Sequence, residues 1–202
     1  MKKFIQDFPI HIKKSISDFK DFEFKFDQIN KIIISGMGGS AIAGMILKDI
    51  FPELELVIER NYFPNTSIDE NTLIISCSYS GNTEETLSYY DYAARLTEHV
   101  IVLTTGGELL KKAKKDGIKY QLLPTGFPPR SSLGFSLAFL ITLFDKNVID
   151  DVNFEYLEKF SKSCSKENSD VNKLAKKIHN TLPMIISEED LSSLGYRLKS
   201  QL

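Results

Sequence analysis

The chain has 202 residues, which suffices for one large domain, or for one complete domain and part of another. With 42% hydrophobic residues and a net charge of −2, it is neither a disordered chain nor a protein whose overall field attracts nucleic acid. The two cysteines exclude a disulfide framework, no run approaches the roughly 18 apolar residues of a membrane span, and the N-terminus lacks a signal-peptide core, so we expect a cytoplasmic protein without membrane or nucleic-acid partners.

We expect the first 28 residues to be helical. Ile12 and Phe19 fall near helical spacing, and Pro9 suits the first turn of a helix, where an amide proton would have no partner. Residues 22–26 alternate aromatic and charged side chains with a period of two. That pattern is typical of a short strand, and an irregular packed connector fits it equally well.

Short apolar runs rich in β-branched residues follow, with helical patterns between them. The expected strands are residues 31–36, 54–58, 72–77, 99–103 and 118–122, and the expected helices are residues 40–50, 84–96 and 108–115. Runs that do not alternate are typical of strands buried on both faces of a parallel sheet. The alternation of strands and helices therefore predicts an α/β fold with a doubly wound, five-stranded parallel sheet. In such a sheet, ligands bind at the carboxyl ends of the strands.

The second half of the chain begins with a stiff loop and a long apolar helix. Residues 124–132 contain three prolines, and residues 133–144 are apolar enough for a buried helix. The polar segment 145–153 then indicates a domain boundary. We therefore expect one domain over residues 1–150 and the beginning of a second over residues 151–202.

The pattern of this second part is more polar. Residues 154–180 indicate a polar helix that is interrupted by the serine-rich segment 161–165. Residues 181–186 have the composition of a new strand, and residues 188–202 that of another helix. Neither internal repeats nor low-complexity segments occur.

The turn at residues 78–86 carries a glycine and the hydroxyls of Ser78, Ser80 and Thr83, among others, between a buried strand and a helix. A helix start offers unpaired backbone amides and a partial positive charge, so hydroxyls that converge on it make an anion site, with phosphate as the natural guest. Alternatively, Thr83 with Glu85 or Thr86 forms only a helix cap. Glu84 and Glu85 are proton-carrier candidates, although carboxylates are common in a first helical turn for the dipole alone.

A second turn, Gly36-Met37-Gly38-Gly39-Ser40, follows the first of these strands. It is not a dinucleotide fingerprint, because Ala41 stands where that motif needs a glycine, and the sequence has no P-loop pattern. Gly38 and Gly39 would let the backbone approach a ligand closely, and the alternative is a tight turn that packs strand against helix.

Arg130 follows two prolines and precedes two serines. A guanidinium on a stiff loop can hold a sugar oxygen or stabilise a developing oxyanion, whereas a lone arginine is also an ordinary surface charge. His11, His99 and His179 have no metal-ligand spacing, so we expect no metal and no cofactor. We expect Cys77 to be a small buried residue rather than a nucleophile.

Three motifs together resemble one family. Ser-Tyr-Ser-Gly-Asn-Thr-Glu-Glu-Thr at residues 78–86 looks like the signature of the sugar isomerase (SIS) domain. With Gly-Met-Gly-Gly-Ser at 36–40 and Pro-Pro-Arg-Ser-Ser at 128–132, the sequence resembles the bifunctional phosphoglucose/phosphomannose isomerases of archaea and bacteria. The resemblance runs in order from the first helix to the last residue. It implies two SIS domains per chain, a homodimer, and metal-free isomerisation of glucose 6-phosphate or mannose 6-phosphate to fructose 6-phosphate.

The resemblance also implies roles for individual residues. The substrate phosphate would be held by Ser78, Ser80 and Thr83. The sugar site would be lined by Gly38, Gly39 and Ser40. Arg130 would stabilise the enediolate while a proton moves between C2 and C1.

Three further groups of the family have no counterpart in this sequence. A glutamate transfers the proton, a histidine helps to open the sugar ring, and a lysine lies near the C-terminus. The glutamate follows a helix that resembles residues 195–202, where this sequence stops. We therefore expect a C-terminally truncated chain that keeps the phosphate-binding half of the site and lacks the proton-transfer half.

Other functions stay open at this point. A second hypothesis is a non-catalytic SIS module that binds a sugar phosphate, as in some regulators. A third is a single-domain isomerase of another phosphosugar, with Glu84, Glu85 or His179 as its base. A fourth is a folded remnant without a ligand, which would expose the apolar surface left by its missing half.

Overall fold

The strands of the protein form one parallel sheet. A computed structural model describes residues 2–145, 147 and 152–202. Its strands run in the order β2-β1-β3-β4-β5, and every neighbouring pair is parallel. The strands are β1 (Lys31–Gly36), β2 (Leu56–Glu59), β3 (Thr72–Ser78), β4 (Val100–Thr104) and β5 (Lys119–Leu122). The expected five-stranded, doubly wound sheet is therefore confirmed, with strand ends within two residues of those expected.

Both faces of the sheet are buried, which explains why its strands do not alternate in hydrophobicity. Successive side chains of a strand point to opposite faces. Ile34 and Ile75, which are aligned in β1 and β3, lie in one apolar cluster. Ile33 and Ile74, aligned one residue earlier, lie in the other. All four side chains are fully buried, so an apolar residue is needed at every position.

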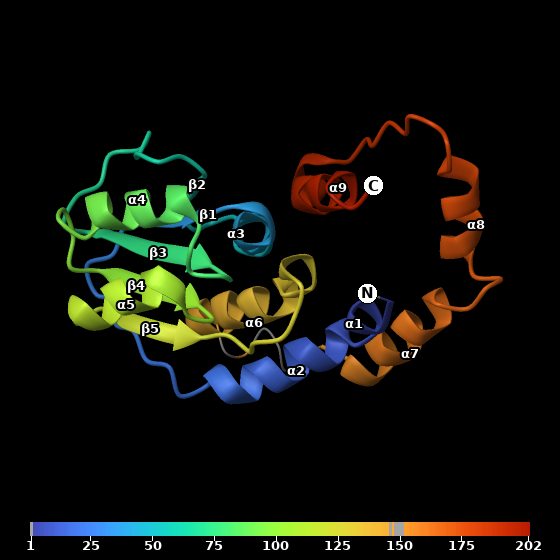
Figure 1. Ribbon diagram of the computed structural model, residues 1–202, viewed down its shortest axis with the longest axis horizontal. Helices are drawn as coiled ribbons and strands as arrows, with labels where there is room; N and C mark the ends of the chain where they lie inside the picture. Colours follow the sequence, from blue (N-terminus) through green and yellow to red (C-terminus); the bar gives the residue numbers. More distant parts are fainter. Residues whose placement is uncertain (1, 146, 148–151) are drawn as a thin grey trace.

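Helices cover each face as a layer (Figure 1). One face carries α3 (Gly38–Ile50) and α6 (Leu133–Phe144), and α2 (Phe8–Phe19) packs on α6 from outside. The other face carries α4 (Glu84–Ala93) and α5 (Gly107–Lys115). Because α6 lies between α3 and α2, its residues 133–142 are all buried, as the apolar sequence predicts.

The N-terminal segment is helical over a shorter stretch than expected. Helix α1 (Lys2–Gln6) leads into α2, which ends at Phe19 rather than near residue 28. Residues 22–26 form no strand, so the connector interpretation is the right one. Their rings pack on α6 instead: the ring centres of Phe22 and Phe139 lie 5.0 Å apart, and those of Phe26 and Phe144 lie 5.2 Å apart.

The polar helix expected over residues 154–180 is present as two helices. α7 (Phe154–Cys164) and α8 (Asp170–Ile178) are separated by a break at 165–169. The interruption expected at 161–165 therefore lies a few residues later, because residues 161–164 still belong to α7. Each start is capped by a side chain. The Asn153 side chain accepts a hydrogen bond from the Tyr156 amide, and the Ser169 hydroxyl accepts one from the Asn172 amide.

The strand expected at residues 181–186 is wrong. This segment pairs with no strand in the part of the chain that the structure describes. Leu182, Met184 and Ile186 are 98%, 86% and 87% exposed. A strand needs a neighbour for its backbone hydrogen bonds, and the segment passes well away from the sheet on its route from α8 to α9 (Figure 1).

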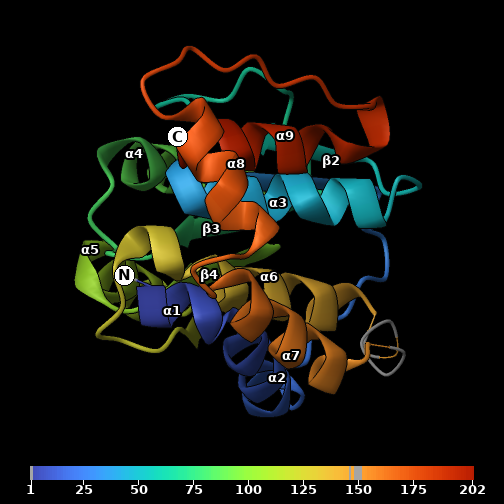
Figure 2. The ribbon, with the colours of Figure 1, turned by 90° about the vertical axis from the view of Figure 1, so that its right-hand side faces the viewer.

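The last segment returns to the first layer of helices. A short 3₁₀ turn, η2 (Glu189–Leu191), precedes α9 (Ser192–Lys199), which packs on α3, while α7 packs on α2 (Figure 2). The expected domain boundary at 145–153 includes residues 146 and 148–151, which lie outside the described residues. Among the helices that are described, none is long and apolar enough to cross a membrane.

Two leucines test this packing with the same chemical change. Leu140 in α6 is fully buried, whereas Leu182 is 98% exposed. We expect Leu140→Ala to lower the free energy of unfolding by about 2–5 kcal/mol, because it removes buried contacts and leaves a cavity. Leu182→Ala is expected to change it by less than about 0.5 kcal/mol. Urea denaturation of both variants measures the difference, and equal losses would contradict the packing described above.

Candidate functional site

The site lies where two neighbouring strands of the sheet end and their chains turn to opposite faces. Gly36 of β1 is aligned with Cys77 of β3. β1 continues into α3 on one face and β3 into α4 on the other. A side chain at Gly36 would not fit, because its Cβ would lie 2.8 Å from the Cys77 carbonyl oxygen. In doubly wound sheets, the ligand-binding crevice lies at such a reversal of direction, outside the carboxyl ends of the strands.

The loop after β3 brings hydroxyls together. The Ser78 Oγ lies 2.8 Å from the Thr83 Oγ1 and also accepts a hydrogen bond from the Gly81 amide at 3.1 Å. The Ser80 Oγ accepts one from the Asn82 amide at 3.2 Å. Ser78 is buried, Thr83 is half-buried and Ser80 is exposed. The predicted convergence of Ser78 and Thr83 is therefore present, with Ser80 at the outer rim of the loop.

Helix α4 starts directly behind these hydroxyls. Thr83 is its N-cap residue, but within the described part of the chain the Thr83 side chain makes no capping hydrogen bond. The alternative that Thr83 is only a cap is therefore wrong. The amides of the first turn have no partner within a helix, and they lie at its positive end. A hydroxyl pair beside an uncapped helix start is suited to bind an anion.

The loop is braced from one side by the turn after β4. The Tyr79 carbonyl accepts hydrogen bonds from the Thr105 amide at 3.1 Å and the Thr105 hydroxyl at 2.7 Å. The Asn82 Oδ1 accepts the Glu108 amide at 3.0 Å, so Asn82 caps the first turn of α5 rather than that of α4. Gly81 makes this contact possible: its φ is +70°, and a Cβ there would overlap the Gly106 carbonyl oxygen.

Tyr79 joins the loop to the proline-rich segment on the other side. Its hydroxyl donates to the Pro124 carbonyl at 2.9 Å and accepts the Phe127 amide at 3.1 Å. Sequence reasoning assigned no task to Tyr79 or Asn82. The only signal was their position inside the serine-rich motif, because their partners lie 45 and 26 residues further along the chain.

The glycine motif after β1 begins α3 at the same edge. Gly38 has φ +53°, and the space where its Cβ would stand is open, so the backbone here is accessible. At Gly39 a Cβ would lie 3.4 Å from the Pro129 carbonyl oxygen. Ser40 is half-buried in the first turn of α3. The motif at 36–40 therefore adjoins both the end of β3 and the proline-rich segment.

Arg130 lies on a short 3₁₀ turn, η1 (Pro129–Ser131), between that segment and α6. The turn is closed by the Ser131 amide, which donates to the Pro128 carbonyl at 2.8 Å, and by the Ser132 hydroxyl, which donates to the Pro129 carbonyl at 2.7 Å. Arg130 itself is exposed. Its guanidinium makes no ion pair with any residue that the structure describes, so no neighbouring carboxylate neutralises its charge.

The other titratable groups of this region are less suited to chemistry. Burial raises the pKa of the Cys77 thiol to about 12, so it stays protonated near neutral pH, as its expected structural role requires. Glu84 accepts a hydrogen bond from the Tyr62 hydroxyl at 3.4 Å, and the charges of Glu85 and Glu84 raise the pKa of Tyr62. His179 is the C-cap residue of α8, and this helix lies far from the sheet (Figure 1).

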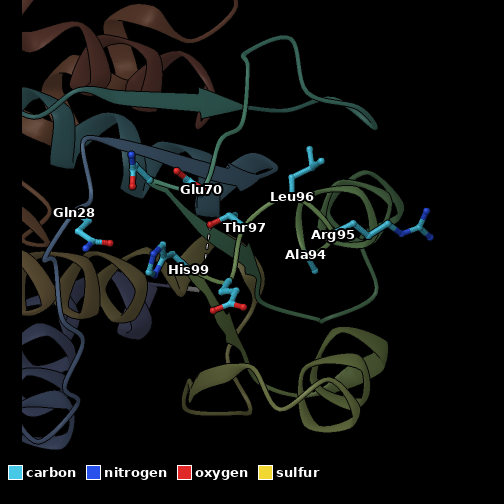
Figure 3. A pocket seen from close by; sticks show the side chains of 9 residues that line it. Gln28, Glu70, Ala94, Arg95, Leu96, Thr97 and His99 are labelled. Carbon is cyan, nitrogen blue, oxygen red and sulfur yellow. Dashed lines mark hydrogen bonds between the residues drawn. The ribbon is translucent and has the colours of Figure 1, made fainter.

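A separate hollow lies at the other end of the strands, where they begin (Figure 3). It has a volume of about 640 Å³ and includes Glu70, which precedes β3, and Thr97 and His99, which precede β4. The Thr97 hydroxyl, which lines this hollow, donates a hydrogen bond to the Thr72 carbonyl at 3.0 Å. Because it lies at the amino ends of the strands, it is not part of the site. Within the described ranges, no group of three His, Cys, Asp or Glu residues could hold a metal ion.

Two glycines test the brace between the loop and the turn after β4. Gly81 and Gly117 have similar φ angles of +70° and +68°, but only at Gly81 would a Cβ meet backbone atoms. Gly117→Ala should cost about 1–2 kcal/mol of unfolding free energy, from left-handed backbone strain alone. Gly81→Ala should cost more than about 3 kcal/mol, because the loop must also move away from Gly106. Thermal or urea unfolding that gave equal costs would contradict the close approach.

His11 gives a pH dependence to the packing beside this site. Its ring centre lies 4.9 Å from that of Phe127 and 5.0 Å from that of Phe135. Its Nδ1 is buried without a hydrogen-bond partner among the described residues. Burial lowers the pKa of His11 below its usual 6.5, and the nearby charge of Asp7 offsets this only in part.

The unfolded chain therefore binds more protons than the folded one as pH falls below 6.5, and the free energy of unfolding should decrease over that range. We expect His11→Gln to reduce this slope, and the same substitution at the exposed His179 to leave it unchanged. Urea denaturation of both variants between pH 5.5 and 7.5 (a range chosen about 1 unit either side of the free imidazole value) measures it. An unaltered slope in His11→Gln would show that His11 is not the group responsible.

The sequence is similar to those of characterised sugar-phosphate enzymes, although no family model matches it. A bifunctional phosphoglucose/phosphomannose isomerase of Thermoplasma volcanium is 36% identical over 183 residues, which cover 90% of this chain and 58% of the relative. One from Caldicellulosiruptor bescii is 34% identical over the same shares of the two chains. A D-glucosamine-6-phosphate 4-epimerase of Sulfolobus acidocaldarius is 29% identical over 85% of this chain and 56% of its own. The chain thus spans less than three-fifths of the length of these relatives.

Solved structures with a similar fold include sugar-phosphate proteins. A tagatose-6-phosphate ketose/aldose isomerase from Escherichia coli has a TM-score of 0.67 at 17% identity, over 96% of this chain and 60% of its own. The C-terminal domain of a glucosamine-fructose-6-phosphate aminotransferase from Francisella tularensis has a TM-score of 0.68 at 13% identity, over 96% and 64%. The resemblance indicated by the three motifs is confirmed: the chain is a relative of the bifunctional phosphoglucose/phosphomannose isomerases, built on the SIS fold.

Proposed function

We propose that the chain binds a hexose 6-phosphate, with the phosphate at the loop after β3. The observation that carries this proposal is the hydroxyl pair of Ser78 and Thr83, 2.8 Å apart, beside the uncapped start of α4. Ser80, exposed at the rim, adds a third hydroxyl. One hydroxyl of the pair donates to the other, so the pair has one proton left for a ligand. A phosphate dianion would accept hydrogen bonds from that hydroxyl, from Ser80 and from the free amides of the first turn of the helix, at its positive end.

The sugar would extend from this phosphate across the crevice between β1 and β3. Gly38, Gly39 and Ser40 begin α3 on its far side, and the open space above Gly38 supports a close approach of the sugar to the backbone. Arg130 stands beside them on η1, whose Pro129 carbonyl adjoins Gly39. Its charge would lie near the C1–C2 end of the sugar.

This arrangement fits an aldose–ketose isomerisation of glucose 6-phosphate or mannose 6-phosphate to fructose 6-phosphate. In that reaction a proton leaves C2 and is returned to C1, while negative charge develops on the adjoining oxygens. A fixed guanidinium stabilises that enediolate most where it is held before the reaction begins. The closed turn of η1 supports such a role for Arg130. In this proposal the described site supplies the phosphate and oxyanion contacts of the whole enzyme.

The organisation of the whole protein is part of the same proposal. Residues 1–150 would be one SIS domain and residues 151–202 the beginning of a second, in a cytoplasmic homodimer that binds no nucleic acid. The net charge of −2 and the reach of the relatives beyond this chain support this arrangement. The epimerase among the relatives favours a second candidate. In it, the same phosphate site serves a reaction of a hexosamine phosphate instead, or only binds such a ligand.

Ser80 provides the direct test of the phosphate site. We expect Ser80→Ala to weaken binding of fructose 6-phosphate by about 1–3 kcal/mol, the cost of one hydrogen bond to a charged group. The control is Ser17→Ala, because Ser17 is exposed on α2 and makes no contact with the site. Isothermal calorimetry on the well-folded chain measures both. The absence of binding by the unaltered chain would disprove the proposed function, and equal affinities for glucosamine 6-phosphate and fructose 6-phosphate would favour the second candidate.

A further inference from the structure

Helix α9 runs beside α3 and is fastened to it at one end. The Ser193 amide donates to the Asp49 carboxylate at 3.2 Å, and the Ser193 hydroxyl donates to the same oxygen. The Tyr196 hydroxyl accepts a hydrogen bond from Arg60 at 2.8 Å, and the Arg60 guanidinium also lies 4.7 Å from the centre of the Tyr196 ring. These contacts fix both the position and the rotation of a short helix that would be marginal alone.

The direction of α9 brings its last turn to the candidate site. Ser193, at its beginning, meets Asp49 near the end of α3. Arg197, at its end, donates from Nη2 to the Arg130 carbonyl oxygen at 2.6 Å. Arg130 lies beside the start of α3, so the two helices are antiparallel, as Figure 2 shows. Arg197 follows Ser193 by four positions, which places both on the face toward α3.

The Arg197 guanidinium therefore lies against the backbone of Arg130, on the turn that adjoins the start of α3. Arg197 is half-buried, and within residues 2–145, 147 and 152–202 neither it nor Arg130 has an acidic partner. Burial lowers the pKa of Arg197, and the charge of Arg130 lowers it further. Placing like charges together costs free energy unless something of opposite charge offsets them. An anionic group of a ligand would do so.

An arginine in a last helical turn has a simpler explanation. Cations are common there because the end of a helix carries partial negative charge. Lys199, in the same turn, meets that need while staying exposed in solvent. Arg197 is instead half-buried, and its guanidinium donates a hydrogen bond to the backbone carbonyl of Arg130. The end of α9 would repel an anion bound nearby, and the Arg197 charge reverses that effect.

We propose that Arg197 is a positioning residue of the sugar-phosphate site: it fixes Arg130 through its carbonyl and adds a second positive charge at the oxyanion end of the crevice. This inference rests on the proposed function. The ligand feature it recognises is negative charge on the sugar end of the molecule, apart from the phosphate. The enediolate of an isomerisation carries such charge, and the carboxylate of an aldonic acid 5-phosphate imitates it.

Two ligands separate this role from a merely structural one. D-Arabinonate 5-phosphate and D-arabinitol 5-phosphate share the phosphate and differ in a carboxylate against a hydroxymethyl group. We expect the unaltered chain to prefer the arabinonate. Arg197→Gln should reduce that preference about tenfold, and Arg197→Lys should restore part of it. Lys199→Gln removes one charge from the same turn of α9 and should leave the preference unchanged. Calorimetry measures all the affinities on the full chain.

The outcomes distinguish the inference from the proposed function. Equal weakening of both ligands by Arg197→Gln would show that Arg197 acts only on the structure, and this would overturn the inference while the phosphate site stands. Loss of the preference in Lys199→Gln as well would reduce the effect to overall charge and overturn it too. No binding of either ligand by the unaltered chain would overturn both. If Arg197→Gln does not fold, Arg197→Met keeps the packing of the stem and replaces it in the same comparison.

Discussion

The parallel pairing of β1 with β3 is the constraint on which the site depends. The two strands are adjacent in the sheet although β2 lies between them in the sequence, and their chains leave toward opposite layers of helices. At the last paired position, Gly36 lies against the Cys77 carbonyl with no room for a side chain. That contact brings the glycine motif and the serine-rich loop to one crevice. Any change that widened it would move both sides of the candidate ligand site at once.

The serine-rich loop is held by its neighbours rather than by its own helix. Tyr79 ties it to the proline-rich segment, and Asn82 ties it to the start of α5. These two polar side chains are thereby occupied with contacts that hold the loop, whereas the Ser80 side chain is exposed. A loop that is already fixed loses little conformational entropy when a ligand binds. Such a loop would therefore bind a phosphate more tightly than a flexible loop with the same hydroxyls.

Much of this architecture could be predicted from sequence because it depends on local patterns. Buried strands of a parallel sheet are apolar on both faces, and continuous apolar runs such as Ile32 to Ile34 indicate them. The end of β2 was harder to predict, because its last residue, Glu59, is charged and yet buried. The Glu59 carboxylate accepts hydrogen bonds from the amides of Asn65 and Thr66, and a hydrophobic pattern does not reveal such contacts. Residues 181–186 have strand composition, but pairing is a property of two segments, and composition describes only one.

The least predictable part of the candidate site is the part that comes from furthest along the chain. Arg130 and Arg197 are 67 residues apart, and no spacing rule connects them. They are connected through α3. This helix begins beside η1, and near its other end its residue Asp49 holds the beginning of α9. One helix thus sets both the backbone of the proposed sugar site and the distance that α9 must cover. Because α9 is antiparallel to α3 and only eight residues long, its last turn arrives at Arg130 rather than beyond it. The negative end of its dipole arrives there too, and a half-buried arginine at that point makes the arrangement compatible with an anion.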